Sequence, residues 1–136
     1  MPRTSGRLLT FDLLFLTALA VISVVGVAAT ADDAPAFVGN YAREFTGAGG
    51  PVTETLEVKA DKTVVWTSNY PGRAALVQSG IWNSRGKTLV VVLGKRDGEQ
   101  MPATERVVFD LKGDDLKGRE YDKNVHGNNG LVFHRK

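Results

Sequence analysis

Alternation of polar and apolar residues in the segment Val52–Tyr70 constrains the fold of this chain more than any other feature. Leu56 and Val58 share one face of an extended stretch. Val64 and Trp66 share one face of the next stretch, and three turn-prone residues separate the two. Period-two alternation rich in Thr, Val and aromatic residues is typical of β-strands, so this segment predicts an antiparallel hairpin.

The same pattern recurs along the rest of the chain. Further short strands are predicted at 37–45, 79–83, 88–93, 104–111, 116–121 and 131–136. Residues 32–36 are expected to be a loose leader, and 47–51, 94–103 and 122–130 are expected to be irregular loops. The chain is therefore predicted to be all-β, with about eight strands and no long helix.

A small antiparallel meander barrel, lipocalin-like in architecture, is the fold that this strand pattern favours. Strands that follow one another closely can pair in order, and closing the sheet removes the two exposed edges of an open meander. A two-sheet sandwich is the alternative, because strand number alone does not distinguish the two architectures.

The first 31 residues are predicted to be a secretory signal peptide. Arg3 and Arg7 precede the apolar run Leu13–Ala29, and Ala29-Thr30-Ala31 has small residues where a signal peptidase cleaves. An uncleaved membrane anchor is the alternative, since a helix of about 17 residues spans about 25 Å, the short limit for a bilayer. Residues 32–136 are expected to form a single β-barrel domain, periplasmic or secreted.

The chain contains no cysteine. This excludes disulfides, thiolate metal sites, a cysteine nucleophile and a lipid-acceptor cysteine after the apolar run. Export without disulfides favours a bacterial envelope protein. Lys and Arg number 17 against 15 Asp and Glu, interspersed along the chain, so no nucleic-acid partner is expected. Membrane contact is expected only through the N-terminal segment, if it is not cleaved.

Neither a catalytic site nor a metal site is predicted. His126 and His134 are the only histidines, and apart from Asp122 no further strong ligand accompanies them at a regular spacing. Ser79 lacks the glycine-flanked elbow of an α/β hydrolase, and no carboxylate pair falls in an expected cleft. We therefore expect a protein without enzymatic activity and without a cofactor.

The aromatic residues allow two interpretations. One or two occur on each predicted strand, so they can fill the core of a small barrel, which is the interpretation that we favour. Eight-stranded barrels are also about the size at which the interior can hold one small ligand. In that case the residues expected to line a pocket for an apolar ligand are Tyr41, Trp66, Tyr70, Trp82 and Tyr121.

Several short motifs carry a resemblance to a known family. They are Gly39-Asn40-Tyr41, the run Glu54–Asp61 leading into Val64-Val65-Trp66, Gly80-Ile81-Trp82, and Leu131–Arg135 after a Gly-rich turn. Together they resemble the N-terminal domain of the NlpE-type copper-resistance lipoproteins. Lipocalin-like barrels in general share the Gly-x-aromatic start and a late arginine that can stack on the aromatic ring.

This resemblance implies a small meander barrel in the bacterial envelope, in a family tied to copper tolerance and to surface-sensing stress responses. The cysteines of that family do not occur here, so its thiol-based copper binding and redox sensing are not implied. The family pattern usually has Gly after Asp61, whereas this chain has Lys62. If that position is left-handed, Lys62 strains the turn, and Lys62→Gly should be neutral or stabilising.

The function expected from these features is that of an exported, non-catalytic binding module in the bacterial envelope, with a small apolar ligand as its target. The alternative is a protein-interaction or envelope-stress-sensing module that binds an envelope partner through an exposed loop, for which Gly94–Ala103 is the candidate.

Overall fold

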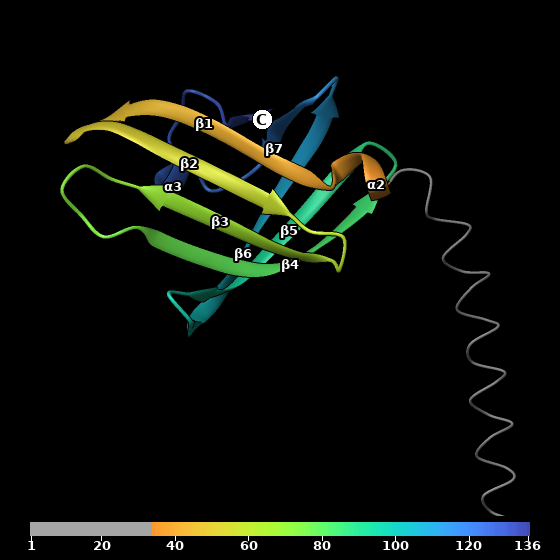
Figure 1. The fold of residues 1–136 in the computed structure, drawn as a ribbon, viewed down its shortest axis with the longest axis horizontal. Coiled ribbons are helices and arrows are strands. Elements are labelled where there is room, and N and C mark those ends of the chain that lie inside the picture. Colours follow the sequence, from red (N-terminus) through yellow and green to blue (C-terminus); the bar gives the residue numbers. More distant parts are fainter. Residues whose placement is uncertain (1–33) are drawn as a thin grey trace, which may run out of the picture. The chain divides into compact units, whose positions relative to one another are not determined.

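A computed structural model describes residues 34–136, and the predicted signal peptide lies outside the described residues. The elements are α2 (Ala34–Phe37), β1 (Gly39–Gly47), β2 (Gly50–Val58), β3 (Thr63–Asn69), β4 (Leu76–Arg85), β5 (Thr88–Arg96), β6 (Glu99–Lys112), β7 (Asp115–Glu120), α3 (Lys123–His126) and β8 (Val132–Arg135). Consecutive strands pair antiparallel, and β8 pairs with β1 to close a barrel (Figure 1). No helix in the described part of the chain is long and apolar enough to cross a membrane.

The closed barrel confirms the predicted meander and excludes the sandwich. Leu56 and Val58 of β2 point into the barrel, as do Val64 and Trp66 of β3, and all four are at most 1% exposed. The two strands pair with Leu56 opposite Trp66, so the alternation read from the sequence places both apolar faces on the same side of the wall.

Two segments predicted as loops are in fact regular hairpins. The glycine-rich segment 47–51 belongs to β1 and β2, which pair as far as Gly47 and Gly50. Segment 94–103 belongs to β5 and β6, which are joined only by Asp97 and Gly98, with φ of 51° and 85°. Positive φ at both central residues is the requirement of a two-residue type I′ turn, and Asp-Gly is among the sequences that favour it.

Two helical turns lie where the sequence indicated extended or irregular chain. Phe37 was expected in the first strand, but it ends α2 and is fully buried inside the barrel. The predicted loop 122–130 contains α3, which begins after Asp122; the Asp122 side chain accepts a hydrogen bond from the Asn124 N–H. Short helices of this kind leave no hydrophobic periodicity, so the pattern of the sequence could not reveal them.

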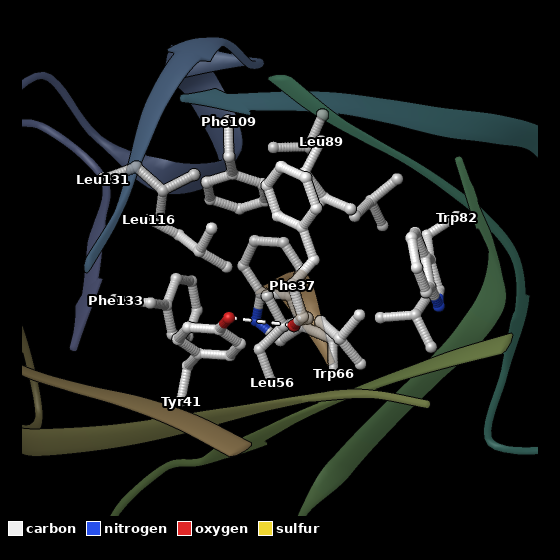
Figure 2. Close-up of a cluster of buried hydrophobic side chains, with 14 of the residues drawn as sticks. Phe37, Tyr41, Leu56, Trp66, Trp82, Leu89, Phe109, Leu116, Leu131 and Phe133 are labelled. Carbon is white, nitrogen blue, oxygen red and sulfur yellow. Dashed lines mark hydrogen bonds between the residues drawn. The ribbon is translucent and has the colours of Figure 1, made fainter. Parts of the chain in front are cut away.

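Side chains from the whole circumference of the wall meet in one core (Figure 2). The largest fully buried side chains include Trp66, Tyr41, Phe37, Phe109 and Phe133. The Phe133 ring meets Trp66 edge-on at 5.1 Å between centroids and Phe109 at 5.9 Å. The middle of the barrel is therefore occupied by aromatic side chains, as the filled-core interpretation expected.

The end of the barrel next to α2 is closed by a hydrogen-bonded stack. The Tyr41 hydroxyl donates to the Phe37 carbonyl oxygen at 2.8 Å and accepts from Arg135 Nη2 at 2.7 Å (Figure 2 shows the first of these). Arg135 also lies over the Tyr41 ring and donates to the carbonyl oxygens of Ala36 and Val38. The late arginine thus stacks on the first-strand aromatic, as the resemblance implied.

Candidate functional site

The buried polar side chains of the described residues lie together at one end of the barrel, the end next to α3. The buried polar residues are Arg43, Glu54, Ser68 and Gln78, and Glu105 and His126 adjoin them. We call these six residues the polar network. The end near α2 has no comparable group among the residues that the structure describes.

Glu54 is the centre of the polar network. Its Oε1 accepts from Arg43 Nε at 2.6 Å, and its Oε2 accepts from Ser68 Oγ at 2.7 Å and from Trp66 Nε1 at 3.1 Å. The sheet register explains this arrangement, because Glu54 lies opposite Arg43 on one side and opposite Ser68 on the other. Residues paired across strands share a face, so all three point inward.

The Arg43–Glu54 pair is expensive to bury. The side chains are 8% and 5% exposed, and removing two ions from water costs several kcal/mol for each. Every fully buried side-chain nitrogen and oxygen in the described residues has a hydrogen-bond partner. The pair is thus tolerated because each of its fully buried atoms has a hydrogen-bond partner, whereas an apolar pair in the same space would avoid the cost of removing two ions from water.

Glu105 and His126 form a second buried contact that holds α3 against the barrel. His126 Nε2 lies 2.6 Å from Glu105 Oε2, and the imidazole stacks on Trp66 at 5.0 Å between centroids. The pKa of Glu105 is lowered, chiefly by the hydrogen bond from His126, although burial opposes this effect. Tyr121 also contacts the imidazole, in a T-shaped arrangement with 6.2 Å between the ring centroids.

A cavity of about 560 Å³ lies between this network and the segment that carries α3. It is lined by Arg43, Phe45 and Thr46 of β1 and by Asn124, Val125, His126, Gly127, Asn129 and Gly130 of the β7–β8 connection. We call it the mouth cavity. Its volume falls within the range of small-molecule sites, about 300–1,000 Å³.

The Arg43 guanidinium presents unused donors at the mouth cavity. Nε is engaged by Glu54, and Nη1 donates to the Gly130 carbonyl oxygen at 3.4 Å. Nη2 has no acceptor among residues 34–136, and since no fully buried nitrogen lacks a partner, Nη2 is accessible from outside. The guanidinium lies over the Phe45 ring at 4.4 Å. An acceptor group beside an aromatic or aliphatic body would match this pair of residues.

The five residues predicted to line a ligand pocket are not brought together. Tyr41 and Trp82 lie toward the α2 end, where Trp82 Nε1 donates to the Lys59 carbonyl oxygen. Trp66 lies in the core between them and the polar network. Tyr70 lines a separate depression, and Tyr121 packs on His126 beside the network.

Comparisons of the chain with models of protein families, with curated proteins and with solved structures found no match. The resemblance to the NlpE-type domain therefore stays a prediction that depends on the short motifs alone. Within residues 34–136, no three His, Asp or Glu side chains lie close enough to hold a metal ion. What the mouth cavity does provide is a directed cationic donor, amide side chains and an exposed aromatic ring.

The sequence contained a signal for part of this site. Period two places Glu54 on the same face as Leu56 and Val58, and it places Arg43 on the same face as Tyr41. A charged residue on an otherwise apolar face of a strand is the pattern that indicates a buried polar site. The residues predicted to line a site were aromatic and did not include this pair.

Proposed function

We propose that this protein is a non-catalytic binding module of the bacterial envelope, and that it binds a small ligand in the mouth cavity. The observation that carries the proposal is the Arg43 guanidinium, which is nearly buried, is held in place by Glu54, lines the cavity, and has no acceptor for Nη2 among residues 34–136. The envelope location depends on the predicted signal peptide.

The ligand proposed here differs from the apolar molecule expected from the sequence. The interior is filled by aromatic side chains, whereas the mouth cavity lies at one end of the barrel. Its lining combines one cation, two asparagines and a threonine with Phe45 and Val125. We infer a compact molecule that has a carboxylate or similar acceptor for Arg43 and a flat or aliphatic body for Phe45.

Benzoate is a suitable probe because it combines a carboxylate with a flat ring. Titration followed by amide NMR should shift the signals of Phe45, Thr46 and residues 124–130, and benzamide should shift them much less. Chemical-shift changes spread over the whole barrel, or changes of equal size with benzoate and benzamide, would contradict the proposal. Native mass spectrometry of protein purified from its own envelope would then identify the natural ligand.

The variant that tests the role of the guanidinium must keep the barrel folded. Arg43→Met alone leaves Glu54 unpaired, so we combine it with Glu54→Gln, whose amide oxygen can still accept from Trp66 and Ser68. The double variant should fold and lose the benzoate response. Asn128→Ala is a matched control, because Asn128 belongs to the same connection but does not line the cavity. Retention of benzoate binding by the double variant would exclude Arg43 as the anchor.

A protein-interaction function is the second candidate, and the β5–β6 hairpin favours it. Segment Gly94–Ala103 forms the tip of this hairpin, and most of it is exposed. Residues 101–104 of β6 have no partner on β5, and β7 pairs only from Val108 onward, which leaves part of β6 as an edge. Crosslinking in cells should capture a defined envelope partner, and shortening the tip should abolish that capture while the barrel stays folded.

A further inference from the structure

The outer wall of the barrel contains a second hollow that the proposed function does not use. It lies over β3, β4, β5 and the first part of β6 and has a volume of about 560 Å³. Its apolar part is made by Val65, Ile81 and Val92, which point away from the core. Ile81 lies opposite Val92 in the sheet and is 62% exposed, the highest value among the large exposed apolar side chains described. We call this hollow the wall groove.

The wall groove is formed by irregularities of the strands. The pairing of β4 with β5 shifts between Ser79 and Gly80, and that of β5 with β6 shifts between Leu93 and Lys95. Such bulges bend a strand and increase its local twist. At Gly80 an added Cβ would overlap the Val92 carbonyl oxygen, so only glycine allows this close approach of β4 and β5. The shape of the wall groove is therefore determined by the path of the backbone.

The charges at the wall groove have one sign. Lys59 and Lys95 are the charged residues that line it, and no carboxylate is part of its lining. An apolar floor with two ammonium groups is complementary to an aliphatic chain that ends in an anion. The lining, all of it within the described residues, also lacks Trp, Tyr, Phe and Arg, the residues that protein interfaces favour as anchors.

We propose that the wall groove binds a free single-chain anionic amphiphile, with its chain on Val65, Ile81 and Val92 and its carboxylate at Lys59 or Lys95. The volume of the hollow falls within the range of small-molecule sites, about 300–1,000 Å³. This site is independent of the mouth cavity, because no residue lines both.

Decanoate below its micelle concentration is the probe, and amide NMR of the labelled protein is the measurement. Shifts should concentrate at Val65, Ile81, Val92 and their strand neighbours. Decyltrimethylammonium, which has the same chain and the opposite charge, should bind at least about five-fold more weakly. A response of equal strength to both head groups would overturn the charge argument.

Two surface variants test the two halves of the groove. Ile81→Asn should weaken decanoate binding about ten-fold, because the exposed side chain offers much of the apolar contact. Lys59→Gln combined with Lys95→Gln should weaken it about five-fold and remove most of its salt dependence. Val77→Asn is the matched control: Val77 is an exposed apolar residue on β4 that does not line the groove. If Val77→Asn weakens binding as much as Ile81→Asn, the assigned position is wrong.

The remaining outcomes separate this proposal from its competitors. The double variant Arg43→Met with Glu54→Gln should leave the decanoate shifts at the groove unchanged, which distinguishes failure here from failure at the mouth cavity. Sedimentation of the free protein should show a monomer. A dimer that Ile81→Asn dissociates would assign the groove to a second copy of the chain. Binding to phosphatidylglycerol vesicles without binding of monomeric decanoate would assign it to a membrane surface. Either result would overturn the proposal.

Discussion

Breaking the buried Arg43–Glu54 pair is the most informative perturbation of this barrel. Arg43→Met removes the cation and leaves the Glu54 carboxylate, whose side chain is 5% exposed, with only Trp66 and Ser68 as donors. Removing one partner of a buried ion pair costs about 3–5 kcal/mol. A domain of this size is stabilised by about 5–15 kcal/mol, so Arg43→Met should consume a large part of the stability.

The expected cost follows from the unpaired charge, so it should shrink when the charge is also removed. In Arg43→Met with Glu54→Gln, the neutral amide can still accept from Trp66 and Ser68, and the methionine fills the space of the arginine stem. We expect the double variant to be more stable than Arg43→Met alone by at least about 1.5 kcal/mol, because it no longer buries an unpaired charge.

Urea unfolding followed by tryptophan fluorescence measures these free energies. Trp66 donates to Glu54, so its emission reports on the network directly as well as on global unfolding. The exposed pair Arg106–Glu120, 3.1 Å apart with both side chains more than half exposed, supplies the control. Arg106→Met should cost less than about 1 kcal/mol, because solvent screens that pair.

Two results would refute this reasoning. If Arg43→Met destabilises the protein no more than Arg106→Met does, water must reach the Glu54 carboxylate, and the argument from its burial is wrong. If the double variant is less stable than Arg43→Met, an unpaired Glu54 carboxylate is not what makes the loss of Arg43 costly. Should Arg43→Met fail to fold, recovery of folding in the double variant would give the same information.

Three further predictions concern other parts of the barrel. Lys62 has φ of 73°, and its ammonium lies 4.2 Å from the Trp82 ring centre. The free energy of unfolding of Lys62→Gly should therefore be near that of the native protein and about 1 kcal/mol above that of Lys62→Ala. Equal values for the two variants would disprove strain in the turn. Because the pKa of Glu105 is lowered in the folded state, chiefly by the hydrogen bond from His126, its contribution to stability should be complete above its usual pKa of 4.5 and be lost as the pH falls below it; thermal melts should show a smaller acid loss in Glu105→Gln. Gly80→Ala should cost more than about 2 kcal/mol in urea unfolding, because the methyl group would enter the neighbouring strand, whereas Gly94→Ala, which meets no atom, is the control.

The left-handed conformation of Lys62 confirms one local expectation from the sequence and adds to it. The turn position is predicted from the place that glycine takes in the family pattern that the short motifs resemble. The contact of Lys62 with Trp82 could not be predicted, because it depends on how β4 returns beside the β2–β3 turn. The substitution Lys62→Gly thus gains by relief of strain and loses by removal of a cation–π contact, each about 1 kcal/mol.

Strand pattern and barrel closure could be predicted because both depend on period-two alternation and on the lengths of the connections. The pairing of the buried charges could not, because it depends on register. Arg43 faces Glu54 only because β1 and β2 are joined by the two-residue turn Ala48–Gly49. The glycine-rich composition of residues 47–51 predicts a longer loop, and such a loop leaves the register of the two strands undefined.

The contrast between the two ends of the barrel is the basis for placing the proposed ligand site at the α3 end. At the α2 end, Arg135 donates hydrogen bonds to the Tyr41 hydroxyl and to backbone carbonyl oxygens, and these contacts close that end. At the α3 end, Arg43 is held by one carboxylate and one carbonyl oxygen and keeps accessible donors. If these side chains only filled space, apolar residues at both ends would avoid the cost of desolvating charges. A cation that is buried, oriented and incompletely used is better explained by a ligand than by stability, and the benzoate titration tests this explanation directly.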